Sequence, residues 1–287
     1  MKKYKILALV LWMVACSMAG SFKQEETIQK EFPISKPDAD FTLIVDNVWG
    51  AIHLKGTSGN TVKAVIHKKI QARSENQFQL AVQEVALDIS EEKNLLEFFV
   101  DGPFRDRHNG RDHDGWHERK YKVIYQFDLE VPRDLSIEIK TVNDGDITIE
   151  DIRGNYRVNN VNGEITMTGL HGSGKAYTVN GDLICFFDQN PKADCNFGTI
   201  NGDVKLYFQN PLSAQFAMKA FNGDAYSDFE LTHIASDPEI IKETKGRTRY
   251  KSVHRYCATA GHGGPLIKWD GFNGDLLILK YHKGEQS

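Results

Sequence analysis

Cysteine and proline are both scarce in this sequence, with 4 and 8 of them among 287 residues. So few cysteines exclude a scaffold held together by many disulfides. Long apolar runs are lacking too, because no stretch approaches the roughly 18 residues of a membrane-spanning helix. The net charge is small, since the sequence has 35 basic and 39 acidic residues. That balance excludes a strongly basic nucleic-acid-binding protein.

The composition is otherwise that of an ordinary folded protein, with 40% hydrophobic and 26% charged residues. A wholly disordered chain is excluded, because enough apolar side chains are present to form a core. The 24 glycines follow no triplet period, so a collagen-like chain is excluded as well. The length allows one large all-β domain or two smaller domains.

The first residues have the features of a secretion signal. Lys2, Lys3 and Lys5 form a positive segment, and an uncharged apolar run of ten residues follows at 6–15. Such a run is too short to cross a bilayer of about 30 Å, but it suits the apolar region of a signal peptide. We therefore expect residues 1–19 to be a signal peptide and the protein to be exported to the periplasm, outer membrane or cell surface.

Two cleavage sites fit this signal. Residues 17–19 (Ser-Met-Ala) have the small residues that ordinary signal peptidase prefers, which places the cut after Ala19. Residues 13–16 (Met-Val-Ala-Cys) resemble a bacterial lipobox, and in that interpretation the signal ends before Cys16, which is lipidated. Acyl chains on Cys16 would be the protein's one contact with a membrane.

The middle of the chain repeats the triplet Asn-Gly-Asp/Glu. Its glycines at positions 145, 163, 181, 202 and 223 are spaced by 18, 18, 21 and 21 residues, and a last copy lies at 274. A degenerate copy lies at Trp49-Gly50-Ala51. Asn-Gly favours the positive φ that a tight corner needs. The triplets are Asp144–Asp146, Asn162–Glu164, Asn180–Asp182, Asn201–Asp203, Asn222–Asp224 and Asn273–Asp275.

Apolar residues alternate with mostly polar ones after each glycine, which predicts short strands with one buried face. Stacked coils can bury faces that a single coil cannot bury alone. We therefore expect an all-β, β-solenoid-like stack with two or three short strands per repeat, in which Cys185 is a core residue in register with Met167 and Leu206. An antiparallel β meander or sandwich is the alternative, because Asn-Gly is also a good hairpin turn.

The repeat region is expected to span residues 136–283, with an insertion at 231–270. The segment before it, residues 30–135, is predicted to form a strand-rich cap that covers one end of the stack, where unpaired edge strands would otherwise be exposed. Together the cap and the repeat region are expected to make one continuous domain.

The cap has its own local signals. Alternation predicts a strand at Thr61–Ala72, and helical spacing of apolar residues with Ser74 as N-cap predicts a short helix that ends near Glu84. A hairpin is expected to turn at Glu91–Asn94. A further strand should begin at Tyr121 and end at Pro132, since proline cannot donate to a sheet. The cap is therefore predicted to contain strands and one short helix.

The order of several landmarks resembles the bacterial putative-adhesin family, a domain of unknown function with β-strand repeats. The landmarks are the run Phe41–Ile52, the Val-Pro-Arg-Asp of 131–134 that leads into Ile139–Ile147, and the Gly-Gly-Pro of 263–265 that leads to Phe272–Leu276. The resemblance covers roughly residues 30–283. It implies a β-solenoid-like fold and, in some relatives, an association with envelope-stress systems. It implies no catalytic residues, because the family offers none.

One group of basic residues is a candidate ligand-binding site. Arg247, Arg249 and Lys251 alternate along a predicted strand, which would place their charges on one face. Such a face suits an anionic glycan or a lipid headgroup. The competing interpretation is a solvated strand face that balances an otherwise acidic protein.

One group of histidines is a candidate metal site. His108, His113 and His117 lie among acidic residues in the segment 104–120, and imidazole and carboxylate groups together can bind Zn²⁺ or Cu²⁺. Their spacing matches no closed site, however, and arginines in the same segment repel a cation. We therefore predict a solvated loop and no metal.

The acidic residue after each glycine forms a second candidate cation site. Stacked coils would bring these carboxylates within about 4.8 Å of one another, close enough to share Ca²⁺. The favoured interpretation is that each carboxylate instead accepts a main-chain N–H within its own turn. For the cysteines beyond the signal we expect buried free thiols, although pairing of Cys185 with Cys195 stays open.

The sequence contains no nucleophile elbow, no H-E-x-x-H motif and no phosphate-binding loop, so we predict no enzyme and no cofactor. The predicted function is that of a non-catalytic, exported cell-envelope protein, an adhesin-like or structural binding module. Its expected partner is an envelope protein or a glycan, and not nucleic acid. The alternatives are a periplasmic accessory of an envelope-stress system and a polysaccharide-active enzyme.

Overall fold

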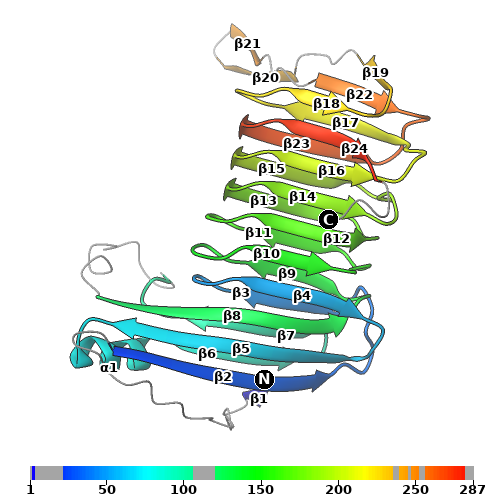
Figure 1. Cartoon of the computed structure of the whole chain (residues 1–287). Coiled ribbons are helices and arrows are strands. Elements are labelled where there is room, and N and C mark those ends of the chain that lie inside the picture. The colour runs from blue at the N-terminus through cyan, green and yellow to red at the C-terminus, as the bar shows by residue number, and fades with distance from the viewer. Residues whose placement is uncertain are drawn as a thin grey trace. The chain divides into compact units, whose positions relative to one another are not determined.

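The computed structural model describes residues 2–3, 22–105, 120–234, 239–244, 247–251 and 256–281. Its contacts divide the chain into unit 1, Met1–Gly163, and unit 2, Glu164–Ser287. Apart from one helix, the described elements are all strands, as Figure 1 shows, and the expected all-β class is confirmed. No helix in these described ranges is both long and apolar enough to cross a membrane.

Unit 1 contains two sheets with an apolar core between them. Phe98 of one sheet meets Phe32 and Phe127 of the other, with ring centroids 5.7 and 6.1 Å apart. The first sheet has the order β1 (Lys2–Lys3), β6 (Ala86–Glu92), β7 (Leu95–Asp101), β3 (Thr42–Asp46), β9 (Ser136–Lys140) and β11 (Tyr156–Asn159). The second has the order β2 (Phe22–Pro33), β5 (Thr61–Ala72), β8 (Tyr121–Pro132), β4 (Ile52–Thr57) and β10 (Ile147–Glu150).

Pairing in unit 1 changes from antiparallel to parallel along each sheet. The β2–β5, β5–β8 and β6–β7 pairs are antiparallel, whereas β3, β4 and β9–β11 pair in parallel. In the parallel part Ile52 is the register partner of Ile147. Trp49 likewise bridges Asn143. The degenerate triplet at Trp49-Gly50-Ala51 is therefore a true corner of the stack.

The predicted helix is present as α1 (Glu75–Glu84). Ser74 is its N-cap, and the Ser74 hydroxyl accepts the Gln77 main-chain N–H at 3.3 Å. The helix packs against β5 and β8 with Ala81 fully buried. Val82 is an apolar residue of the same helix, but it is 44% exposed. A short helix on a flat sheet buries only a narrow stripe, and Val82 lies outside it.

Unit 2 also consists of two sheets. Phe187 of one packs against Phe197 of the other at 6.2 Å, and Phe208 packs against Phe216 at 6.2 Å. The first sheet has the order β13 (Gly174–Asn180), β15 (Cys195–Asn201), β23 (Leu266–Asn273), β17 (Ala214–Lys219), β22 (Tyr256–Ala260) and β19 (Leu231–Ile234). The second has the order β12 (Ile165–Leu170), β14 (Leu183–Phe187), β16 (Val204–Phe208), β24 (Leu276–Lys280) and β18 (Ala225–Ser227). A separate hairpin joins β20 (Glu239–Thr244) to β21 (Arg247–Lys251).

The strands of the second sheet of unit 2 pair in parallel, each one coil away from the next. Met167, Cys185 and Leu206 are register partners and are fully buried, as the spacing predicts. From β12 to β18 successive strands alternate between the two sheets, so each of these coils contributes one strand to each sheet. The β-solenoid-like stack is therefore confirmed, and the antiparallel meander is not the architecture of the repeat.

The last coil in the sequence is not the last coil in space. β23 lies between β15 and β17, and β24 lies between β16 and β18. Leu276 accordingly has Val204 as its register partner on one side and Ala225 on the other. The coil of β17 and β18 therefore ends the parallel stack of unit 2. Beyond this coil the first sheet continues with antiparallel β22 and β19, whereas the second sheet ends at β18.

Candidate functional site

In unit 2, each corner at which the chain passes from the first sheet to the second is built on the glycine of a triplet. Gly202 has a φ of +143° and Gly274 a φ of +138°, which residues with a Cβ rarely adopt. A Cβ on Gly202 would also lie 2.2 Å from the main-chain oxygen of Gly181 in the neighbouring coil. Glycine is thus required both for the backbone turn and for the close approach of successive corners.

The asparagines of the triplets form a row of side-chain hydrogen bonds, which we call the amide row. Asn201 donates from Nδ2 to Oδ1 of Asn180 at 2.8 Å, and Asn273 donates to Asn201 at 2.9 Å. Asn222 in turn donates to Asn273 at 2.9 Å. Each carboxamide therefore links its coil to the next one, which explains why asparagine recurs at the corner.

The aspartates form a parallel carboxylate row. Oδ1 of Asp182 accepts the main-chain N–H of Asp203, Asp203 accepts that of Asp275, and Asp275 accepts that of Asp224, all at 2.9 Å. The expectation that each carboxylate accepts an N–H of its own turn is wrong for these residues, because the donating N–H belongs to the neighbouring coil. Within the described ranges no group of three or more His, Cys, Asp or Glu residues could hold a metal ion.

Asp182 also forms an ion pair with Lys205, whose Nζ lies 2.9 Å from Oδ2. Burial alone would raise the pKa of Asp182, but the Asp203 N–H and the Lys205 ammonium together lower it. The hydrogen bond to Asp182 likewise raises the pKa of Lys205. Both groups therefore stay charged at neutral pH. Lys205 lies between Ile184 and Leu277 in the strand register, on the outer face described next.

In the second sheet of unit 2, the outer face of β14, β16 and β24 is mostly apolar, whereas β12 carries Thr166 and Thr168 at its outward positions. Intervening positions that were expected to be mostly polar carry hydrophobic side chains in β14, β16 and β24, and these alternate with buried core residues. Lys205, paired with Asp182, is the charged exception among these strand residues before Lys280. We call this surface the apolar face; its residues are Ile184, Phe186, Tyr207, Leu277 and Leu279.

Two aromatic rings organise the apolar face. Phe186 and Tyr207 are register partners on β14 and β16, and their rings stack with centroids 4.2 Å apart and planes 12° apart. Tyr281 lies against Phe186 at 5.6 Å. Because the two rings face each other across neighbouring strands, their planes are roughly perpendicular to the sheet and their edges point outward. An edge-on surface suits aliphatic and aromatic side chains better than it suits the flat face of a sugar ring.

The outer face of the second sheet of unit 1 is charged. Oppositely charged side chains on neighbouring strands form ion pairs, so this face carries paired charges rather than apolar side chains. The pairs are Lys69–Glu25 at 2.8 Å, Lys63–Glu130 at 3.3 Å and Lys55–Glu150 at 3.5 Å, and the polar side chain of His67 lies 3.6 Å from Asp128 on the same face. A large, half-exposed apolar surface is unusual for a monomer and marks an interaction site. Of these two surfaces, the apolar face is therefore the candidate binding site.

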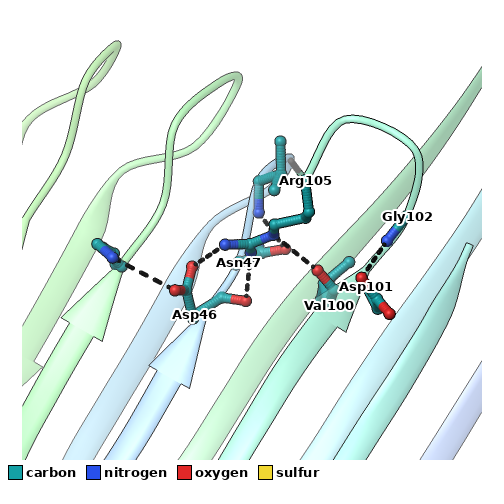
Figure 2. Close-up of polar contacts among 8 residues, drawn as sticks. Asp46, Asn47, Val100, Asp101, Gly102 and Arg105 are labelled. Atoms are coloured by element: carbon teal, nitrogen blue, oxygen red, sulfur yellow. Dashed lines mark hydrogen bonds and ion pairs between the residues drawn. The ribbon is translucent and has the colours of Figure 1, made fainter. Parts of the chain in front are cut away.

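A second polar cluster lies in unit 1, where the segment 106–119 begins. Figure 2 shows Arg105 reaching across to Asp46: Nη1 binds the carboxylate at 2.7 Å and Nη2 binds the main-chain oxygen of the same residue at 2.9 Å. Nε donates to the Val100 oxygen at 3.0 Å, and Lys140 lies 3.3 Å from the other Asp46 oxygen. Three of the five guanidinium N–H groups are thus bound within the protein, so this arrangement anchors the chain.

The residues beside this cluster support the same conclusion. Asn47 is fully buried and donates to the main-chain oxygens of Gly50 and Tyr125 at 3.1 and 2.7 Å. Phe104 packs edge-on against Trp49 at 5.1 Å. The first corner of the stack and the start of the segment are therefore fixed to each other.

The structure describes only some of the candidate residues proposed from the sequence. His108, His113 and His117 lie outside the described residues, as do Cys16 and residues 4–19 of the signal peptide. Arg247, Arg249 and Lys251 lie on β21, which pairs with β20 and with no other described strand.

The described cysteines are free thiols. Cys185 and Cys195 are buried, while Cys257 is half-buried. Burial raises the pKa of Cys185 well above its ordinary value, and the neighbouring Cys195 adds to that rise. The Cys185 thiol is therefore protonated and unreactive at neutral pH, as expected for a structural cysteine.

No family model matches the sequence, and no curated protein matches it either. Solved structures do match. A putative cell adhesion protein from Clostridium sporogenes aligns over 89% of this chain and 100% of its own, with 10% identity and a TM-score of 0.40. A putative adhesin from Bacteroides fragilis aligns over 89% and 97%, with 13% identity and a TM-score of 0.31.

A putative lipid binding protein from Parabacteroides distasonis aligns over 89% of this chain and 97% of its own, with 12% identity and a TM-score of 0.28. Two of these three proteins are described as adhesion proteins. In its structure, this chain is similar to proteins described as putative adhesins.

Proposed function

We propose that this protein is an exported, non-catalytic, adhesin-like binding module that contacts a protein partner at the cell surface. The observation that carries the proposal is the apolar face, on which Phe186, Tyr207 and Leu279 are half-exposed on a rigid sheet. A surface of this kind loses water-exposed apolar area when a partner covers it, which favours association.

The rigidity of the apolar face supports a binding role. Its strands are held in register by parallel pairing and by the two corner rows, so little conformational freedom is lost on binding. The ring edges favour a protein over a glycan, because protein side chains can pack between them. The apolar segment at 6–15 supports export, which a surface partner requires.

In-cell photo-crosslinking tests the proposal. A photoreactive phenylalanine analogue replaces Leu279 on the apolar face and, as a matched control, Lys55 on the charged face of unit 1. We expect a discrete adduct with another protein from position 279 and none from position 55. Equal adducts from both positions, or none from position 279 at normal protein levels, would contradict a partner at the apolar face.

Single substitutions separate binding from folding. Tyr207→Ser removes one ring of the stack from the surface, whereas Phe208→Ser removes a fully buried ring from the core. The first change should abolish the adduct at position 279 while leaving the thermal midpoint within a few degrees. The second should lower the midpoint strongly. A Tyr207→Ser protein that still forms the adduct would exclude the ring stack from the contact.

A further inference from the structure

The coil of β17 and β18 leaves every row of the unit 2 stack unfinished. Among the described residues, no main-chain N–H donates to the Asp224 carboxylate and no side-chain amide donates to Oδ1 of Asn222. In the coils before it, both positions are filled by the following coil. The corner of this coil therefore presents the acceptors that a further strand would use.

A stack of aromatic rings also ends at this coil. Phe221 stacks on Phe272 with centroids 4.8 Å apart and planes 2° apart, and Phe221 is 73% exposed. Phe272 covers one face of the Phe221 ring, so the exposed face points along the stack, away from the preceding coil. A ring in the next strand could stack there as Phe221 stacks on Phe272.

The main chain of β18 is also unpaired on one side. Leu276 N–H donates to the Asp224 oxygen and Asp228 N–H donates to the Ile278 oxygen, so the even-numbered residues face β24. Ala225 and Ser227 then direct their N–H and C=O groups to the opposite side, since these directions alternate in a strand. β18 is the end of its sheet in the described part of the chain, and its three residues are exposed.

A groove lies beside this edge because the first sheet of unit 2 extends further along the stack than the second sheet does. β22 and β19 extend the first sheet two strands beyond β17, and the second sheet has no described strands opposite them. The groove has a volume of about 340 Å³ and is lined by apolar residues of both sheets and of the core between them, among them Met218, Ala225, Tyr226, Leu231, Tyr256 and Trp269. Inward side chains of an added strand would fill it.

From these four features we propose that β18 accepts an extended segment of a partner protein as an added parallel strand. The expected segment has an aromatic residue, Asn and Gly in succession, then apolar residues at the second and fourth positions after the glycine. In this pattern the aromatic ring stacks on Phe221, the Asn amide donates to Asn222, and the apolar side chains fill the groove. A main-chain N–H of the segment donates to the Asp224 carboxylate. The proposal concerns a different surface from the apolar face and does not depend on it.

The groove also limits the kind of occupant. Two strands span about 10 Å at the usual spacing, so the overhang of β22 and β19 leaves room for one extended segment or one hairpin. A second folded copy that brought its own β18 to this edge would carry its own overhang into the same space. The occupant is therefore an extended segment of a partner rather than a second copy of the domain.

A synthetic peptide with the sequence of residues 270–280 (Asp-Gly-Phe-Asn-Gly-Asp-Leu-Leu-Ile-Leu-Lys) is a suitable probe, because this strand already pairs with β18 on its other side. Fluorescence anisotropy of the labelled peptide with the folded chain should show saturable binding of one peptide per chain. A peptide with alanine in place of Gly274 should bind about tenfold more weakly, since its Cβ would meet the Gly223 oxygen. A peptide with serine in place of Leu277 should bind within about twofold of the original, because that side chain points outward.

Variants of the acceptor locate the site. Ala225→Pro removes an N–H that points away from β24. The fold does not need this N–H, because proline is tolerated on an edge strand, but an added strand would bind it, so peptide binding should weaken about tenfold. Ala225→Ser keeps the N–H and should bind within about twofold of the parent. Asp224→Ala leaves the backbone intact and should weaken binding several-fold, which keeps the test decisive if the proline variant unfolds. Absence of saturable binding, or equal affinity in Asp224→Ala and the parent, would overturn the proposal.

Discussion

The Asp182 carboxylate accepts a hydrogen bond at 2.9 Å from the main-chain N–H of Asp203, 21 residues further along the chain. The same contact recurs between Asp203 and Asp275 and between Asp275 and Asp224. Successive coils are thus joined at their corners by side chains as well as by strand pairing. The contact recurs because Asp follows Asn-Gly in each of these four coils, and each copy can be tested separately.

Asp203→Ala should lower the free energy of unfolding by about 1 kcal/mol, because the Asp275 N–H loses its acceptor. Asp224→Ala is the matched control, since that carboxylate ends the row and accepts no main-chain N–H in the described structure. The control should change stability by less than about 0.5 kcal/mol. Urea unfolding of the two variants measures the difference, and equal losses would show that the carboxylate row does not stabilise the corners.

Gly202→Ala should be far more harmful than an ordinary glycine substitution. Its φ is +143°, and a Cβ would lie 2.2 Å from the Gly181 oxygen, so we expect a loss of about 2 kcal/mol or more. Gly59→Ala is the control, because its Cβ would meet nothing closer than 3.7 Å. Thermal unfolding should show a clear drop for the first variant and little change for the second. A tolerated Gly202→Ala would mean that the corners can move apart.

The Asp182–Lys205 pair should make stability depend on pH at both extremes. The pKa of Asp182 is lowered in the folded state, so its contribution is present above the unfolded value of about 3.9 and is lost as pH falls through the folded pKa. The pKa of Lys205 is raised, so its contribution is lost as pH rises through a value above about 10.4.

Lys205→Met tests this pair through the free energy of unfolding at several pH values. The parent should exceed the variant by up to about 1 kcal/mol between pH 5 and 9, and the difference should shrink in acid and in strong base. A difference that stays constant with pH would attribute the effect to packing of the side chain and not to its charge.

Thiol labelling of the native protein should distinguish the cysteines by position. Cys257 is half-buried and should react with an alkylating reagent at pH 8, whereas Cys185 should stay unmodified because burial raises its pKa. Mass spectrometry of the digested protein reads each site separately. Fully denatured protein, in which all of them react, is the control. Equally fast native labelling of Cys185 would contradict its place in the core.

Arg105→Met should destabilise unit 1 by about 2 kcal/mol, because the Asp46 carboxylate and two main-chain oxygens lose their donors. Arg105→Lys should restore little, since an ammonium cannot reach three acceptors placed for the planar guanidinium. Hydrogen exchange of the Val100 and Asp46 region reports the change locally. Full rescue by lysine would show that charge alone, and not the forked geometry, holds this corner.

Much of the repeat could be predicted from the sequence. Alternation after each glycine fixed the strands, and the constant position of the core residue fixed the register of Ile165, Leu183 and Val204. The spatial place of the last coil could not be predicted. Every coil has the same corner triplet, so Leu276 fits equally well beside any of them, and the sequence does not say which neighbours it takes.

The apolar face was missed although its signal was present. The segments Leu183–Phe187 and Leu276–Leu279 are uninterrupted apolar runs, which a strand with one solvated face does not need. The repeating core pattern lies at the positions two and four residues after each glycine, and Phe186 lies outside that pattern. The Arg105–Asp46 contact had no local signal, because the two residues are 59 positions apart and meet only in the fold.

Protease treatment of intact cells tests the central claim most directly, with an antibody against the mature chain as readout and a periplasmic protein as the internal control. The proposed adhesin-like role predicts that the signal disappears while the periplasmic control stays intact. A signal that survives until the outer membrane is broken would contradict it, because a protein confined behind that membrane cannot meet a partner at the cell surface.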